Sequence, residues 1–287
     1  RRIDRREEII HVQNPCSPHY SVMQTEVLAV LALKPGSCCM DGTLGAGGHS
    51  QAILNAIAPT GNLVSFDLDP DAISLASGRL APYGERVRII HDSYTNADRY
   101  IEPESLDGAL LDLGVSSMQL DNGERGFSFM RNGPLDMRFD PNSTGPSAAD
   151  LIASASEEEL ADIFWKYGEE RASRRAAAAI VREREAEPFT TTAQLAETLA
   201  RALPRNPKSG HHPATNVFQA LRISVNGELD TVERALPVIT KLLKPGGRFV
   251  VLTFHSLEDR LVKEYFRRES TGCLCPSRQM VCTCGHQ

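Results

Sequence analysis

Residues 41–50 read DGTLGAGGHS, a glycine-rich turn between the apolar run CCMD (38–41) and the helical stretch SQAILNAIA (50–58). Glycines in such a turn let backbone N–H groups approach a ligand without a clash at Cβ. A strand, a glycine loop and a helix in this order predict a cofactor-binding turn in an α/β fold. The alternative is that the glycines make only a tight turn.

The residues around the loop indicate which cofactor it binds. The loop contains G-x-G at 45–47, but His49 follows Gly48, so the dinucleotide fingerprint fails and a pyrophosphate ligand is disfavoured. Asp67 ends the next apolar run about 20 residues later, where a carboxylate can accept from both hydroxyls of a ribose. These features suggest S-adenosylmethionine rather than NAD, unless Asp67 merely caps a helix.

Strands and helices alternate over the first half of the chain and again near its end. Strands are predicted at 38–41, 62–69, 87–92, 106–114 and 248–254, and helices between and after them at 70–80, 228–243 and 255–270. This alternation predicts a parallel sheet with right-handed crossovers. From Asn122 to Pro213 the sequence offers a Gly/Pro-rich loop and helical stretches at 147–168, 170–185 and 191–203, with no convincing strand.

The sequence therefore predicts an α/β sheet domain interrupted by a helical insertion. Its expected parts are residues 1–121, the insertion 122–213 as a substrate-recognition domain, and residues 214–287. Ligands of open α/β sheets bind beyond the carboxyl ends of the strands. Tyr94, Asp112 and His255 follow three of these ends, which places them at one edge.

Each of these residues has a second interpretation. Tyr94 either lies against an adenine or belongs to the core, and Asp112 either faces the reacting groups or caps the following turn. His255, with Ser256, serves either the substrate or the start of a helix.

Long and uncommon strings carry a family resemblance over nearly the whole chain. They include HYSVMQTEVL (19–28), GVSSMQLD (114–121), ERGFSFMRNGPLDMR (124–138), NVFQALRISVNGEL (216–229) and TFHSLEDR (253–260). The chain resembles the bacterial small-subunit (16S) ribosomal RNA cytosine-N4 methyltransferases of the MraW/RsmH type. The resemblance implies a class I, Rossmann-like S-adenosylmethionine-dependent methyltransferase fold with a helical insertion.

The resemblance also implies cofactor contacts at matching positions. Gly47, Gly48 and His49 match the family's glycine loop, and Asp67 matches the ribose acid. Asp112 and Gln119 match the acid and the amide that flank the methionine end. Tyr94 stands where the family usually has Phe, and Met118 where Pro is common.

The implied reaction methylates an exocyclic amine, a poor nucleophile because its lone pair conjugates with the ring. The enzyme must align nitrogen, methyl and sulfur, and an acceptor near the N–H groups disperses the developing positive charge. Asp112 is the best candidate for that acceptor, with Ser116 and His255 as further catalytic candidates. The target base must leave its stack to enter such a site.

RNA binding requires positive charge, although the net charge of −6 argues against a general polyanion-binding coat. Arg205 and Lys208 lie in an acid-free loop, 204–213, and are expected to contact small-subunit ribosomal RNA. A helix face carrying Arg171, Arg174 and Arg175 is the alternative. Asp136 and Arg138 open the insertion and form either a wall of the substrate pocket or a salt-bridged loop.

The remaining features bound the protein's class. No apolar run approaches the roughly 20 residues of a membrane span, and no signal peptide is expected. Seven cysteines do not suggest a disulfide framework, so a reducing cytoplasm is the simplest compartment. No metal site is predicted. The C-x-C spacing of the final four is tighter than usual for zinc: Cys273, Cys275, Cys282 and Cys284.

Two points stay open at this level. The family usually continues into two further strands beyond the cysteine region, so a truncated chain or an incomplete sheet is expected. A methyltransferase acting on DNA or a small molecule, or a non-catalytic ribosome assembly factor that binds the cofactor, are the alternative functions.

Overall fold

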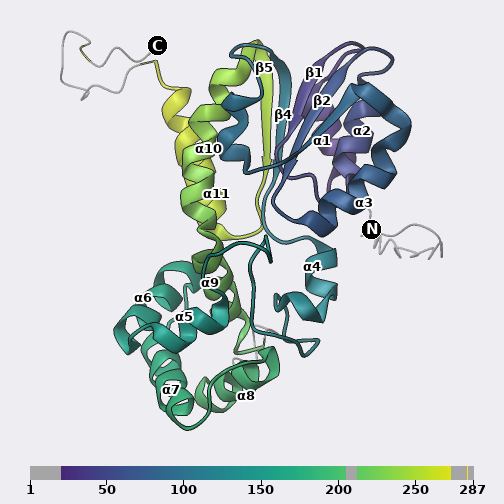
Figure 1. Cartoon of the computed structure of the whole chain (residues 1–287). Coiled ribbons are helices and arrows are strands. Elements are labelled where there is room, and N and C mark those ends of the chain that lie inside the picture. Colours follow the sequence, from purple (N-terminus) through teal and green to yellow (C-terminus); the bar gives the residue numbers. More distant parts are fainter. Residues whose placement is uncertain (1–20, 205–211, 273–282, 284–287) are drawn as a thin grey trace, which may run out of the picture.

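The structure is a computed structural model that describes residues 21–204, 212–272 and 283 (Figure 1). Its centre is a five-stranded sheet in the order β3-β2-β1-β4-β5, with every neighbouring pair parallel. The strands are β1 (Cys38–Asp41), β2 (Asn62–Asp67), β3 (Val87–His91), β4 (Leu106–Asp112) and β5 (Leu243–Leu252). The order reverses between β1 and β4, which is the place where such sheets bind ligands.

Helices cover both faces of the sheet, as Figure 1 shows. On one face α1 (Gln24–Leu31), α2 (Gly48–Ala56) and α3 (Pro70–Leu80) bury one apolar cluster. On the other, α10 (Glu228–Leu242) and α11 (Ser256–Glu269) bury a second. The short 3-10 turns are η1 (Ala81–Arg86), η2 (Tyr94–Arg99) and η3 (Gly123–Arg125). The predicted α/β sheet is therefore confirmed.

The bounds of β2, β4 and β5 differ from the prediction by two or more residues. β2 and β4 end at Asp67 and Asp112, two residues early, because the chain turns away at the ligand edge. β5 begins at Leu243 rather than residue 248, since Leu243 already pairs with Leu106 before a register shift. The predicted turn at 244–247 is thus part of the strand.

The insertion forms a separate helical body below the sheet in Figure 1. Its helices are α5 (Ala148–Ser154), α6 (Glu157–Gly168), α7 (Ser173–Ala186) and α8 (Thr192–Ala202), and the short helix α4 (Ser117–Asp121) precedes it. The helical stretch predicted at 147–168 is two helices, because Ser156 caps α6 in a reciprocal pair of hydrogen bonds with Glu159. Thr191 caps α8, as its sequence predicts.

Helix α9 (Thr215–Asn226) joins the two bodies. Its buried residues Val217, Phe218 and Leu221 belong to the apolar cluster of the insertion, together with Phe164 of α6. Sequence analysis placed this helix in the second part of the sheet domain. The domain bounds themselves stay a prediction. Within the described residues, no helix is long and apolar enough to cross a membrane.

Candidate active site

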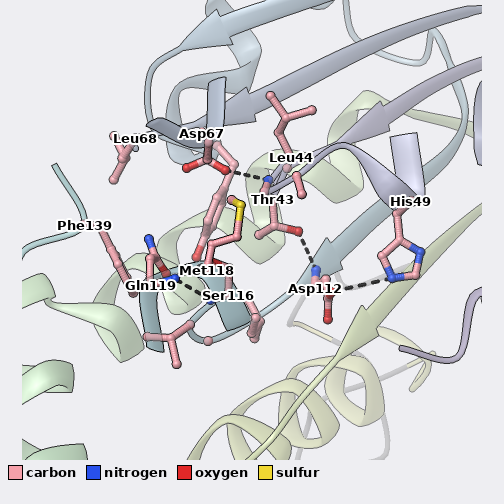
Figure 2. A pocket seen from close by; sticks show the side chains of 18 of the residues that line it. Thr43, Leu44, His49, Asp67, Leu68, Asp112, Ser116, Met118, Gln119 and Phe139 are labelled. Atoms are coloured by element: carbon pink, nitrogen blue, oxygen red, sulfur yellow. Dashed lines mark hydrogen bonds and ion pairs between the residues drawn. The ribbon is translucent and has the colours of Figure 1, made fainter. Parts of the chain in front are cut away.

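A cavity of about 600 Å³ opens at the carboxyl ends of the strands (Figure 2). This volume lies within the range of small-molecule and cofactor sites. The predicted residues that line it are Gly48, His49, Asp67, Tyr94, Asp112, Ser116 and Gln119. Residues from four strand ends thus meet at one place, as the sheet topology requires.

The glycine loop is fastened to Asp67. Asp67 accepts hydrogen bonds from the backbone N–H of Gly45 (2.7 Å, Oδ2) and of Asp69 (2.9 Å, Oδ1). Each carboxylate oxygen keeps a second lone pair, which leaves room for ligand hydroxyls. Burial raises the pKa of Asp67 despite these bonds. The helix cap considered for Asp67 is made by Asp69 instead, which accepts from the N–H of Asp71.

Two glycines of the loop have distinct roles. Gly47 has φ of +77° and precedes α2, so it makes the left-handed turn but does not line the cavity. Gly48 lines the cavity, and a Cβ there would meet Ser21 Oγ, so the Ser21 side chain would have to rotate away. Gly48 thus permits a close approach of Ser21 and does not serve an unusual backbone angle.

Asp112 ends β4 with one free carboxylate oxygen. Its N–H donates to Thr43 Oγ1 (2.6 Å), and its Oδ2 lies 3.5 Å from Nε2 of His49. Oδ1 is buried and has no hydrogen-bond partner. Burial alone would lower the pKa of His49, but the interaction with Asp112 and the charge of Asp41 outweigh it, and the pKa is raised. Asp112 therefore presents an acceptor oxygen beside an imidazole that can be charged.

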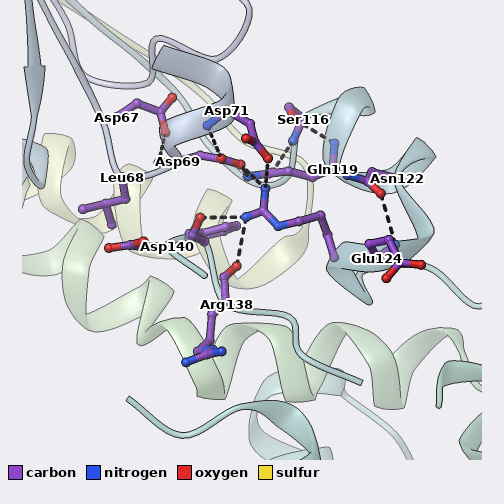
Figure 3. Close-up of polar contacts among 12 residues, drawn as sticks. Asp67, Leu68, Asp69, Asp71, Ser116, Gln119, Asn122, Glu124, Arg138 and Asp140 are labelled. Carbon is purple, nitrogen blue, oxygen red and sulfur yellow. Dashed lines mark hydrogen bonds and ion pairs between the residues drawn. The ribbon is translucent and has the colours of Figure 1, made fainter. Parts of the chain in front are cut away.

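The side chains of Ser116 and Gln119 form hydrogen bonds at the start of α4 (Figure 3). Ser116 Oγ accepts from the N–H of Gln119 (3.2 Å), and Gln119 Oε1 accepts from the N–H of Ser116 (3.0 Å). Gln119 Nε2 donates to Oδ2 of buried Asp69 (2.8 Å). The amide thus ties α4 to the end of β2 at the cavity wall.

Arg125 completes this connection, and sequence reasoning did not single it out. Its Nη1 lies 2.6 Å from Asp69 Oδ2, and its Nη2 donates to the carbonyl of Phe139 (2.8 Å). The Asp69 and Arg125 side chains are 3% and 8% exposed. An Arg within an uncommon string, ERGFSF, is the one sequence signal that could have marked it.

Tyr94 lies in the cavity wall, and its surroundings are acidic. Burial raises the pKa of its phenol, and the charges of Glu228 and Glu258 act in the same direction. The hydroxyl thus stays protonated over the physiological range. Its stacking on an adenine stays a prediction.

Besides Gly47, three predicted site residues that the structure describes lie outside the cavity wall. Arg138 forms a fork on Asp136 at 2.7 and 2.8 Å and also donates to the carbonyl of Ser143, so the pair makes the salt-bridged loop rather than the pocket wall. His255 precedes α11, with Nδ1 accepting from the N–H of Glu258. Arg205, Lys208 and the four C-terminal cysteines lie outside the described residues.

The cavity wall also contains charged residues that sequence reasoning missed. Glu228 accepts two hydrogen bonds from Arg222, at 2.7 and 2.9 Å. Burial raises the pKa of Glu228 in spite of Arg222. Burial acts likewise on Glu258, but bonds from His255 and the Phe254 N–H outweigh it and lower that pKa.

Glu228, His255 and Glu258 bring ligand atoms within 4.8 Å of one another, a spacing that could hold a metal ion. Two observations oppose a metal here. The Arg222 guanidinium already neutralises Glu228. His255 Nδ1 accepts from the N–H of Glu258, and its Nε2 lies 3.0 Å from Glu258 Oε1, so both ring nitrogens already face protein groups. We therefore interpret the cluster as a network of polar side chains that satisfy one another.

The parallel sheet, the glycine loop after β1 and the acid at the end of β2 define a class I S-adenosylmethionine-dependent methyltransferase. The chain belongs to the MraW methylase family, whose model matches residues 16–287. The resemblance found in the sequence is thereby confirmed, as is the enzyme class.

Curated relatives are similar over most of their length. A protein of Geotalea uraniireducens is 51% identical over 271 residues, which is 93% of this chain and 86% of the relative. One of Syntrophotalea carbinolica is 50% identical over 277 residues, 94% of this chain and 87% of the relative. Both are named ribosomal RNA small subunit methyltransferase H.

Proposed function

We propose that this protein transfers the methyl group of S-adenosylmethionine to the N4 amine of a cytosine in small-subunit (16S) ribosomal RNA. The observation that carries the proposal is the free, buried Oδ1 of Asp112 in the cavity of a MraW-family methylase. The names of the relatives supply the RNA substrate. With such a substrate, we expect the reaction to take place in the cytoplasm.

The residues around the cavity fit the cofactor. Asp67 would accept from the ribose hydroxyls, Tyr94 would lie against the adenine, and the loop at Gly48 and His49 would pass close to the ligand. Asp112 would lie toward the methionine end of the cofactor. Gln119 lines the cavity there and donates a hydrogen bond to Asp69. When bound, S-adenosylmethionine supplies a methyl group on a sulfonium, which is already a strong electrophile.

Asp112 is therefore assigned the task of orienting the amine. Its Oδ1 can accept an N–H of the amine, which directs the nitrogen lone pair and stabilises the positive charge that develops on it. The amine must lose one proton after it is methylated. Asp112 can accept that proton through its unpartnered Oδ1, while its Oδ2 lies 3.5 Å from Nε2 of His49.

The helical insertion is proposed to recognise the RNA. It lies below the sheet in Figure 1, and its Phe139 lines the cavity. Arg205 and Lys208 are the proposed phosphate contacts. Asp136 and Arg138 would then act through the shape of their loop, since their charged groups form an ion pair with each other.

The direct test is methyl transfer from labelled S-adenosylmethionine to isolated small subunits, followed by mass mapping of the RNA. A single labelled cytosine carrying the methyl on N4 is expected. DNA and free nucleosides serve as competing acceptors, and label on either of them in preference would overturn the proposal. Cofactor binding without turnover on any acceptor would indicate an assembly factor.

A further inference from the structure

The described residues include an exposed aromatic ring at the mouth of the cavity. Phe254 lines the cavity, yet 57% of its surface is exposed. It follows β5 by two residues, and Leu252, the last residue of that strand, pairs with Asp112. Phe254 and the proposed acceptor Asp112 thus emerge from neighbouring strands at one edge of the sheet.

The backbone of Phe254 is held in place although its ring is exposed. Its N–H donates to Oε2 of Glu258 (2.9 Å), and Glu258 is 1% exposed and tied to His255. The ring lies beside Gly114, where a Cβ would be 3.6 Å from Phe254 Cδ2. Gly114 has φ of +91°, so the chain turns there without placing a side chain against the ring. The ring therefore projects from a backbone that is held by Glu258, and one side of it is open.

We propose that Phe254 is the platform on which the target pyrimidine stacks once it has left the RNA. This inference rests on the function proposed above and adds the subsite for the base. Enzymes that modify a base hold it by stacking on aromatic or apolar side chains. A phenyl ring carries no polar group, so it contributes a flat surface, while Asp112 supplies the polar contact to the amine.

The polar residues near Phe254 in the cavity wall are paired with one another. Glu228 and Arg222 satisfy each other in the cavity wall, and Glu258 is satisfied by His255 and the chain. They therefore form a paired part of the cavity wall, which does not compete with Asp112 for the amine. Phe254 adds a largely exposed apolar surface to the same wall.

The test compares Phe254→Ala, Phe254→Leu and Phe254→Trp with the wild-type protein on small subunits. Loss of a stacked base costs about 5- to 150-fold in kcat/KM. Phe254→Ala should show this loss, Phe254→Leu should recover little of it, and Phe254→Trp should recover most. Calorimetry should give wild-type affinity for S-adenosylmethionine in all three, and thermal unfolding should show intact folds.

Leu75→Ala is the matched control, because Leu75 is an apolar residue of similar exposure on α3, outside the cavity wall. It should leave kcat/KM unchanged. Wild-type kcat/KM in Phe254→Ala overturns the inference, as does full recovery by Leu or an equal loss of cofactor affinity. If the wild-type protein itself fails to methylate a cytosine, the proposed function is at fault instead.

Discussion

Nε2 of His49 lies 3.5 Å from Oδ2 of Asp112, with the two side chains 6% and 25% exposed. The imidazole comes from the first turn of α2, and the carboxylate from the end of β4, so the glycine loop and the reacting edge meet in this pair. Since Asp112 raises the pKa of His49, the pair has a charge state that depends on pH.

The first prediction concerns that dependence. The pKa of His49 is raised above its usual 6.5, so the pair stabilises the fold fully below that value and loses this stabilisation as pH rises through the folded pKa. In Asp112→Asn the charge of Asp112 is gone, while burial and the charge of Asp41 remain. The free energy of unfolding should therefore differ from wild type more at about pH 6 than at about pH 9. Denaturant titrations at both pH values measure it, and a difference independent of pH would contradict it.

The second prediction separates chemistry from binding. Asp112→Ala should lower methyl transfer by about 10²- to 10⁴-fold, the usual contribution of a positioned proton acceptor. Affinity for S-adenosylmethionine should fall far less, since the other contacts of the cavity stay. Single-turnover transfer and calorimetry measure the two quantities. Asp121→Ala, an exposed acid at the end of α4, is the control. If affinity falls in step with transfer, Asp112 is only a binding residue.

The third prediction concerns the acid at the end of β2. Asp67→Ala should cost about 1–3 kcal/mol of cofactor binding, because two ribose hydroxyls lose their acceptor. The variant also releases the N–H groups of Gly45 and Asp69. Asp67→Asn keeps one acceptor oxygen and should lose less. Calorimetry that finds unchanged affinity in Asp67→Ala would remove the ribose assignment.

The fourth prediction is about stability. Arg125→Ala leaves Asp69 buried without its cation, and breaking such a pair costs about 3–5 kcal/mol of unfolding free energy. Arg131→Ala is the matched control, because its ion pair with Asp121 is 3.9 Å long and exposed, and so should cost below about 1 kcal/mol. Denaturant unfolding compares the two, and equal losses would show that Asp69 is solvated.

The sheet and its ligand edge could be predicted because their signals are local. Apolar runs that end in Asp67 and Asp112, and glycines between a strand and a helix, follow from the chemistry of a short segment. The split at Ser156 is also local, but the helical period continues across it and hides the cap.

The rest depends on contacts between distant segments. Arg125 meets Asp69 across 56 positions of sequence, and the Asn226 side chain accepts from the N–H of Phe139 across 87. No periodicity marks such pairs before the chain is folded. Asp136 and Arg138 show the opposite case, a contact between near neighbours. Because the two charges are only two residues apart, they pair with each other and form the salt-bridged loop.

The last prediction concerns RNA binding by the loop at 204–213, whose residues 205–211 lie outside the described part of the chain. Replacing Arg205 and Lys208 by Ala removes two positive charges that are expected to contact phosphates. Affinity for small subunits should fall, and the slope of log affinity against log salt should flatten by up to about two units. Filter binding over a salt series measures both.

Cofactor affinity should stay unchanged in the double variant, because the cofactor cavity is lined by residues of the described chain outside this loop. If the loop is instead only a connection to α9, the affinity for small subunits and the salt slope should both stay at their wild-type values. In that case the phosphate contacts belong elsewhere, and the start of α7 is the next candidate, where Arg171, Arg174 and Arg175 are exposed. Replacing Arg174 and Arg175 by Ala would then flatten the salt slope, whereas replacing Arg205 and Lys208 would not. Parallel titrations of the two double variants therefore assign the RNA face to one segment or the other.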